Sequence, residues 1–340
     1  MNMRVNLLKF DIFLNMSYYI CMIQYKVDEL SIEYRSGFNY KAELCRIRCT
    51  VPHVHPYDLE LVYCLDGTIT LVSGEQIFKL EPGSLFSVDY NECHYMCSDE
   101  PALVLILHID LRKVYIDWEL LRYRIFTCES THCFPYQQNA MDRLKDLILA
   151  LSSAQFTSSA SAEDTAKPVD KIIEVMIRYF DWFNYENPDE YINPDLHDRF
   201  YRSLEYCIIN YKKKISASDL ATKEHINPNY FSQFLATTVF NSFSYMIKFV
   251  RCFNAEHLLL QTDMPNYEIA YSVGFSDPKY FYSSFEYWWH RSPKEHRQMY
   301  QNQFEICKKI ENGFETVSDS EAVPIIEKYI SRWHLIKILR

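Results

Sequence analysis

The chain has 340 residues, 48% of them hydrophobic and 16% aromatic, which is enough for two or three domains with buried cores. Its formal net charge of −10 argues against a general binder of nucleic acids or anionic membranes, and no run of about 18 apolar residues predicts a transmembrane helix. The 11 cysteines contain no CxxC pair, which argues against a zinc ribbon or a redox motif and predicts reduced, mostly buried thiols in a cytosolic protein.

Residues 1–29 form an N-terminal segment whose role stays open. An apolar run, IFLNMSYYICMI, follows Arg4 and Lys9, but Asn15 and Ser17 interrupt it and no convincing small-residue cleavage site follows. A secretory signal, a short buried element and extra residues upstream of a later start such as Met22 are the alternatives.

Residues 30–115 predict a domain of short strands. The stretches ELVYCL, TITLVS, QIFKL, SLFSV and ALVLILHID are rich in β-branched and aromatic residues. Turn-forming stretches such as LDGT, SGEQ and EPGS separate them. Several short strands at near-regular spacing predict a β-sandwich or a small barrel.

The hydrophobic period becomes helical in residues 116–195, which we expect to form a helical linker or dimerisation region. Met141, Leu144 and Ile148 mark one helix. The polar stretch 152–168 then predicts a mobile loop, and apolar residues from 172 to 180 mark a second helix. The stretch NYENPDEYINPD ends that helix, because each proline disfavours a helical conformation in the residue before it.

Residues 196–301 predict an all-helical domain with an internal repeat. The stretch DLATKEHINPNYFSQFL, residues 219–235, aligns with EIAYSVGFSDPKYFYSSF, residues 268–285. Between the two copies, FSYMIKFVRCFNAEHLLLQT predicts a long helix that holds them at a fixed separation. Two such units could enter successive major-groove segments about 34 Å apart on one face of DNA.

Each copy of the repeat fits a helix-turn-helix. His225 and Gly274 fall in the turn, where a positive φ is expected and where glycine carries no steric penalty. Asn227 and Ser276 are the predicted N-caps of the second helices, and Pro228 suits the first helical position.

These features resemble the DNA-binding domain of the AraC/XylS family. The second-unit signature of that family, roughly IAxxVGFxDxxYFxxxFKKxxGxSPxxYR, stands here as IAYSVGFSDPKYFYSSFEYWWHRSPKEHR. Its linker-helix pattern stands as Arg251, Ala255, Leu258 and Leu259. The resemblance implies a transcription regulator that binds double-stranded DNA.

The chain departs from the family in the charge of its reading helices. Family members commonly carry Arg or Lys there, whereas residues 227–243 contain neither. Residues 212–300 carry 10 basic and 8 acidic side chains, so the acidity of the chain lies mainly elsewhere. Few phosphate contacts predict weak non-specific binding with a shallow salt dependence, and we expect them from Lys212–Lys214, Lys279, Arg291 and Arg297.

Candidate DNA-binding residues lie on the second helix of each copy and on the helix after the repeat. Since Asn and Gln pair best with adenine, and Lys with guanine, we expect the first half-site to favour A·T pairs. The candidates are Asn229, Ser232, Gln233, Lys279, Tyr282, Ser283 and Arg297.

A histidine pattern marks the predicted barrel. The stretches HVHPYDLELVYCLDG and LEPGSLFSVDYNECH resemble the cupin pattern HxHx4Ex6G followed by a PG turn and a later His. Two readings stay open: a metal site with three nitrogen ligands and one oxygen ligand, or polar groups that line a ligand pocket. We favour the pocket and no metal, because sensor domains of the AraC type resemble cupins and often lack one. The ligand-binding candidates are His53, His55, Glu60, Tyr63 and His94.

The predicted fold is a multidomain α and β protein with a cupin-like barrel, a helical linker and a C-terminal all-α domain of two helix-turn-helix units. Residues 302–340 form an extension of open role. No GxSxG, P-loop or HExxH motif is present, so we predict no enzyme, no catalytic residue and no cofactor.

The predicted function is a cytoplasmic, homodimeric activator of transcription that responds to a small molecule, with a sugar as the guess and RNA polymerase as a further partner. Tyr57, Tyr63, Tyr90 and Tyr95 could stack on such a ligand. The alternatives are a metal-dependent cupin enzyme with an appended helical domain and a degenerate regulator that acts by protein–protein interaction.

Overall fold

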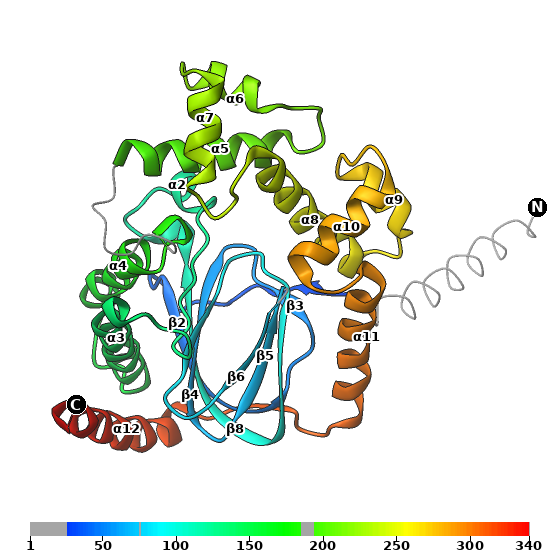
Figure 1. Ribbon diagram of the computed structural model, residues 1–340. Helices are drawn as coiled ribbons and strands as arrows, with labels where there is room; N and C mark the ends of the chain where they lie inside the picture. The colour runs from blue at the N-terminus through cyan, green and yellow to red at the C-terminus, as the bar shows by residue number, and fades with distance from the viewer. Residues whose placement is uncertain (1–25, 75, 185–193, 340) are drawn as a thin grey trace, which may run out of the picture.

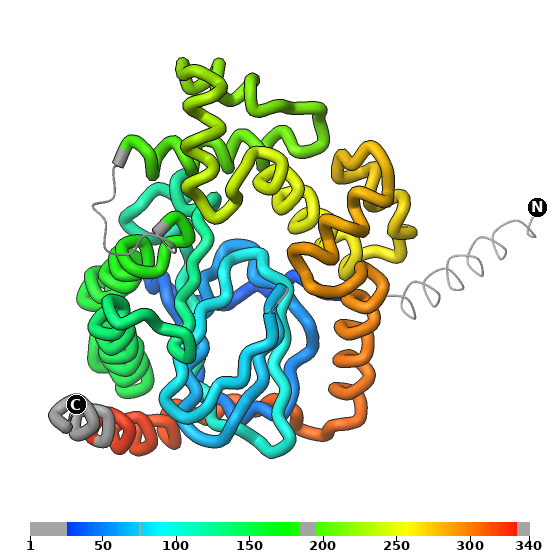
Figure 2. Tube along the Cα trace, viewed as in Figure 1, coloured from blue at the N-terminus to red at the C-terminus, as the bar shows by residue number. Residues whose placement is uncertain are grey.

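The computed structural model describes residues 26–74, 76–184 and 194–339 and shows a barrel surrounded by helices (Figures 1 and 2). The apolar run of the N-terminal segment lies outside the described residues. Within the described residues, no helix is both long and apolar enough to cross a lipid bilayer. The cysteines within the described residues are free thiols.

Nine strands of the described chain form one curled sheet, as the short apolar stretches predict. Strand β8 organises it, because its second half pairs with β2 and β4 and its first half pairs with β3 and β5. The strands are β1 (Asp28–Glu29), β2 (Tyr40–Cys49), β3 (His53–Val54), β4 (Asp58–Asp66), β5 (Ile69–Ser73), β6 (Gln76–Leu80), β7 (Leu85–Val88), β8 (His94–Asp110) and β9 (Phe314–Thr316).

Both faces of the sheet are buried, and the alternation of side chains along β4 shows how. Leu61 and Tyr63 join a core with the helices outside the barrel. Val62 and Cys64 join a second core inside the barrel. Successive strand residues point to opposite faces, so Glu60 belongs to the inner face and Tyr63 to the outer one.

The helices α3 (Gln138–Phe156) and α4 (Ala162–Tyr179) cover the outer face of the sheet. The loop predicted over residues 152–168 is wrong, because α3 continues to Phe156 and α4 begins at Ala162. Tertiary contacts override the polar composition here. The Gln155 amide bonds to the backbone N and O of Ala42, and the Ser161 hydroxyl caps α4 in a reciprocal pair with Asp164.

The C-terminal helices form two helix-turn-helix units joined by one long helix, as the repeat predicts (Figure 1). The first unit is α6 and α7, the second is α9 and α10, and α8 connects them. The bounds are α5 (Pro194–Asn210), α6 (Ala217–Lys223), α7 (Pro228–Ala236), α8 (Phe243–Gln261), α9 (Asn266–Ser272), α10 (Pro278–Trp289) and α11 (Pro293–Lys309). The predicted domain end at residue 301 falls inside α11.

The extension after α11 returns to the barrel. Strand β9 pairs with β2, and helix α12 (Asp319–Leu339) then packs against α3 (Figures 1 and 2). Arg35 forms an ion pair with Asp319 at 2.7 Å, where α12 begins. The helix-turn-helix domain is therefore tied to the barrel region at both of its ends.

The barrel and the helical domain also share a direct interface along α8 and α11. The Tyr300 hydroxyl donates to the Cys93 carbonyl at 2.8 Å, and the Gln303 amide donates to the Thr50 carbonyl at 3.0 Å. The backbone N of Val27 donates to the Leu260 carbonyl at 3.1 Å. These contacts place the end of α8 against the edge of the barrel that carries β3.

Gly274 meets two demands at once in the turn of the second unit. Its φ is +92°, and a Cβ built on it would lie 2.5 Å from the Tyr211 carbonyl oxygen at the end of α5. Arg251 of α8 donates to the same carbonyl at 2.8 Å. The glycine therefore allows α5, α8 and the turn to meet at one point.

Gly274→Ala is expected to lower the free energy of unfolding of the helical domain by at least about 2 kcal/mol, because strain at positive φ adds to a backbone collision. Chemical denaturation followed by circular dichroism measures the loss. Gly83→Ala is the matched control, since Gly83 has a φ of +96° and open space where the Cβ would lie. Equal losses in the two variants would contradict the collision.

Candidate functional site

The two reading helices, α7 and α10, begin in the same way. The Asn227 side chain accepts from the Asn229 backbone N at 2.8 Å, as predicted for an N-cap. The cap predicted at Ser276 is wrong, because Asp277 takes this role and accepts from the Lys279 backbone N at 2.8 Å. An ionised carboxylate at a helix N-terminus is favourable, so Asp277 is the better cap.

Each reading helix buries one face and exposes the other. Phe231 and Leu235 of α7, and Phe281 and Phe285 of α10, are buried in the cores of the two units. Of the predicted DNA-binding residues, those on the exposed faces are Asn229, Ser232, Gln233, Lys279, Tyr282 and Ser283. The structure thus leaves six of the seven candidates available to a ligand as large as DNA.

Arg297 is the exception. Its prediction as a DNA-binding residue is wrong, because its guanidinium bonds to the protein itself. Its guanidinium donates to the Leu259 carbonyl at 2.8 Å and to the Met264 carbonyl at 2.9 Å, and it lies 3.4 Å from the side-chain oxygen of Asn266. These bonds satisfy carbonyls at the end of α8 and in the following loop. Arg297 therefore holds α8 to the second unit.

Exposed tyrosines on the reading surface were missed from the sequence. Tyr230 and Tyr280 occupy equivalent places in the two units, and the rings of Tyr245 and Tyr287 are tilted against each other with centroids 5.1 Å apart. The signal was present, because the repeat aligns Tyr230 with Tyr280 one residue before a buried Phe in each copy. The surface therefore offers aromatic rings and hydroxyls where positive charge is scarce.

Helix α8 sets the distance between the units. Its 19 residues give a length of about 28 Å at 1.5 Å per residue. Met246 and Val250 pack in the core of the first unit, and Ala255 and Leu259 pack in that of the second. A rigid helix of this length suits two units that enter successive turns of the major groove.

A second cluster lies at the barrel edge, where four buried residues bring ligand atoms within 4.8 Å of one another. They are His53, His55, Glu60 and His94. Strand β3 supplies His53, His55 directly follows that strand, and the pairing of His53 with His94 on β8 brings the third histidine beside them. Glu60 reaches the same place from β4.

Backbone carbonyls fix the orientation of the three histidine rings. The Nδ1 atoms of His53, His55 and His94 bond to the carbonyls of Val51, Leu30 and Glu92 at 2.8, 2.9 and 3.0 Å. With Nδ1 as the donor, each Nε2 carries a lone pair. Histidine ligands of metals are usually oriented by such outer hydrogen bonds.

The lone pairs converge on the Glu60 carboxylate. Its Oε2 lies 3.0 Å from His55 Nε2 and 3.4 Å from His94 Nε2. Among the described residues, neither Nε2 has a hydrogen-bond partner with acceptable geometry. Two acceptors at this distance repel unless a proton or a metal ion lies between them, so the donor set fits a divalent metal.

The protonation states of His53 and Glu60 agree with such a site, whereas that of His55 favours a proton shared with Glu60. Burial, together with the neighbouring His94, lowers the pKa of His53 well below its usual range. Burial alone would raise the pKa of Glu60, but the surrounding histidines outweigh it and hold that pKa well below its usual range. Burial opposes charge on His55 as well, but Glu60 outweighs it and raises the pKa of His55. A neutral His53 and an ionised Glu60 are the forms that bind metal.

His108 is a further member of the cluster that the sequence analysis missed. Its Nε2 lies 3.0 Å from Glu60 Oε2, and its ring centroid lies 4.8 Å from that of His55. The cross-strand pairing of Glu60 with His108 in β4 and β8 places them together. The signal in the sequence was weak, because His108 follows the apolar run of β8 without belonging to the HxH motif.

Tyr63 does not belong with the histidines. It lies on the outer face of β4, three residues from Glu60, and its ring packs against Tyr329 of α12 with centroids 5.8 Å apart. The other tyrosines proposed for sugar stacking are also dispersed. Tyr95 packs on Tyr300 in the interdomain interface, while Tyr57 and Tyr90 pack on Trp118 of the short helix α2 (Trp118–Leu121).

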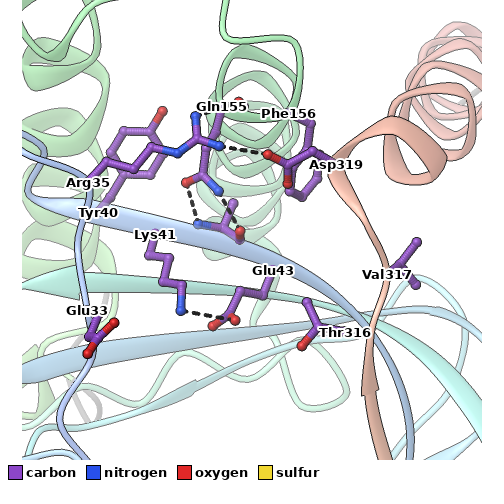
Figure 3. Close-up of a pocket in the computed structure, with 11 residues that line it drawn as sticks. Glu33, Arg35, Tyr40, Lys41, Glu43, Gln155, Phe156, Thr316, Val317 and Asp319 are labelled. Carbon is purple, nitrogen blue, oxygen red and sulfur yellow. Dashed lines mark hydrogen bonds and ion pairs between the residues drawn. The ribbon is translucent and has the colours of Figure 1, made fainter.

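A small polar cavity of about 190 Å³ lies between β2, the end of α3 and the start of α12 (Figure 3). Its polar groups bond to one another. Arg35 pairs with Asp319 at 2.7 Å, and Lys41 pairs with Glu43 at 3.1 Å. The cavity is therefore a joint between the barrel and the C-terminal extension.

Comparisons with known families agree with both domains. Residues 220–299 match the family described as a helix-turn-helix domain, and residues 49–108 match the family described as a cupin domain. Among curated proteins, none matches this sequence.

Several solved structures resemble parts of the chain. ToxT from Vibrio cholerae O395 is 15% identical and covers 77% of this chain and 98% of its own, with a TM-score of 0.40. An AraC-type regulator from Chromobacterium violaceum is 19% identical over 32% of this chain and 96% of its own, with a TM-score of 0.30. The C-terminal domain of the response regulator yesN from Fusobacterium nucleatum is 28% identical over 29% of this chain and 98% of its own, with a TM-score of 0.27. At these TM-scores the likeness carries no argument of its own.

The two family matches, the repeat and the exposed reading helices together define the class. The chain joins an N-terminal cupin domain to a C-terminal helix-turn-helix domain, as its resemblance to the AraC/XylS family implies.

Arg297→Ala is expected to lower the melting temperature by several degrees, because about 1–3 kcal/mol of charged hydrogen bonding is lost. The slope of DNA affinity against salt should stay unchanged. Lys214→Ala is the control, because Lys214 is exposed. This variant should keep its melting temperature, and the slope of DNA affinity against salt should fall by about 1 if Lys214 contacts phosphate. A reduced slope at full stability for Arg297→Ala would contradict the assignment.

Proposed function

We propose that this protein is a cytoplasmic activator of transcription whose DNA binding responds to a small molecule. The reading surface on α7 and α10, held apart by α8, is the single observation that carries the proposal. The two units expose hydrogen-bonding side chains on equivalent helix faces, while their apolar faces fill separate cores. This is the arrangement needed to read two half-sites on one side of DNA.

The barrel supplies the responsive part. Because α8 and α11 contact the barrel directly, a change in the barrel alters the position of the reading helices. A ligand shifts this balance only if it binds one arrangement of the domains more tightly than another. The double attachment through the linker and through β9 limits the arrangements that are accessible.

We propose a metal ion as one ligand of the barrel. His53, His55, Glu60 and His94 would hold it, and the ion would neutralise Glu60 and fix β3 against β8. The buried lone pairs support this proposal over a site for a neutral organic ligand. This proposal departs from the expectation, drawn from the sequence, that no metal binds.

Activation, a homodimeric state and contact with RNA polymerase rest on the family resemblance. The structure gives no support to a sugar effector, because the four tyrosines that suggested one do not surround a single cavity. A regulator that acts only through a protein partner is the alternative, and the single Lys279 on the two reading helices is the observation that favours it.

Gln233→Ala is expected to weaken binding to the preferred first half-site by about 5- to 150-fold, because a bidentate amide contact to adenine contributes about 1–3 kcal/mol. A fluorescence anisotropy titration against DNA selected from a random pool measures it. Gln298→Ala removes an exposed amide from α11 and should have no effect. An unchanged base preference in Gln233→Ala would contradict the role of Gln233.

Purified protein is expected to carry about one Fe, Mn or Zn ion per chain, and His55→Ala should lose it. Elemental analysis by mass spectrometry measures the content. His132→Ala is the control, because His132 is highly exposed and lies outside the cluster. If the wild-type protein contains no metal and binds none after incubation with these ions, the proposed metal site is wrong. The DNA-binding proposal would not be affected.

A further inference from the structure

A cavity of about 680 Å³ lies where the barrel, the linker and the helical domain meet. Its walls come from β6 and β7, from residues 123–129 of the linker, and from α5, α8 and α10. Figure 1 shows α5 and α8 above the barrel. Ligand sites commonly have this volume and lie between domains.

Aromatic rings form much of the wall. Phe78 and Phe86 of the barrel lie with ring centroids 4.4 Å apart, and Trp182 of the linker lies 5.1 Å from Phe249 of α8. Trp289 of α10 completes this wall near Phe249. These rings come from all three regions, so a flat hydrophobic group between them would contact each region at once.

The charged groups of the lining are mostly acidic. The acids that line the cavity are Asp89, Glu92, Glu129 and Glu256. Among the described lining residues, Arg124 is the one side chain with a permanent positive charge. The Arg124 guanidinium is already bonded to Asp181 at 2.5 Å. Two of the carboxylates have histidine partners, Glu129 with His132 at 2.6 Å and Glu256 with His296 at 2.7 Å.

Asp89, which follows β7, is one of the lining acids. Its carboxylate accepts from the Phe126 backbone N at 2.8 Å. Burial, followed by the charge of Glu92, raises the pKa of Asp89 well above its usual range. A bound cation would relieve both effects, because it offsets the lost hydration and the like charge.

Three buried polar atoms of the lining lack partners within the described residues. They are Ser87 Oγ on β7, Arg124 Nε of the linker and Trp289 Nε1 on α10. Buried polar groups are nearly always hydrogen-bonded, so these three atoms mark the cavity as a place that receives a polar molecule.

We propose that this cavity binds a small organic cation with a flat hydrophobic body, such as an aromatic amine, as the effector of the regulator. The ammonium group faces Asp89, and the body lies between Phe86, Trp182 and Phe249. Cation–π attraction to these rings adds to the charge preference. An anion would instead meet four carboxyl groups. The assignment as effector rests on the proposed function, whereas the binding itself does not.

Isothermal titration calorimetry of the full chain tests the proposal with three probes that share an indole ring. Tryptamine carries a cationic tail, 3-ethylindole a neutral one and indole-3-propionate an anionic one. Tryptamine is expected to bind at least tenfold more tightly than either of the others. Equal affinities, tighter binding of the anion or no binding at millimolar concentration would overturn the proposal.

Asp89→Asn separates the role of charge from that of the fold, because an amide oxygen can still accept from Phe126. This variant should lose at least fivefold in tryptamine affinity and keep its affinity for 3-ethylindole. Asp99→Asn is the matched control on an exposed stretch of β8 and should change neither. Ser87→Leu should weaken all three probes by filling the cavity. Unchanged tryptamine affinity in Asp89→Asn, with a native circular dichroism spectrum, would contradict the proposal.

Footprinting on selected DNA, with and without tryptamine, keeps the two proposals distinguishable. Loss of the footprint in all conditions, with tryptamine still bound, would overturn the function alone. A footprint that persists in protein that fails to bind tryptamine would overturn the cavity assignment alone.

Discussion

Burial of one face of α8 is the constraint on which the rest of the structure depends. Its first half fills the core of the first helix-turn-helix unit, its second half fills that of the second, and its last turn lies against the barrel. Each fully buried aliphatic side chain contributes roughly 1.5–3 kcal/mol, so several of them fix both units to one rigid axis. The reading helices, the barrel interface and the cavity between the domains all take their positions from this helix.

The parts that the sequence predicted are those with local and periodic signals. The repeat required two turns and two capped helices, and Gly274 and His225 do adopt positive φ. The HxH motif and strand alternation brought His53, His55 and Glu60 together. Alternation also shows why Tyr63 could not join them, because a residue three positions from Glu60 on the same strand lies on the other face.

The parts that the sequence did not predict depend on contacts between distant segments. Arg297 looked like a phosphate ligand, but the carbonyls that it satisfies lie more than thirty residues earlier in the chain. The stretch 152–168 looked like a loop, but the bonds of Gln155 to Ala42 order it as helix. His108, the cavity between the domains and the return of the extension to β2 likewise arise only from tertiary packing.

The central claim is that α8 holds two DNA-reading units one helical turn apart, and hydroxyl-radical footprinting on DNA selected from a random pool tests it most directly. The account predicts two protected segments on one face of the duplex, with centres about 10.5 base pairs apart, and loss of binding when five base pairs are inserted between them. A single protected segment, or binding that tolerates the insertion, would contradict it.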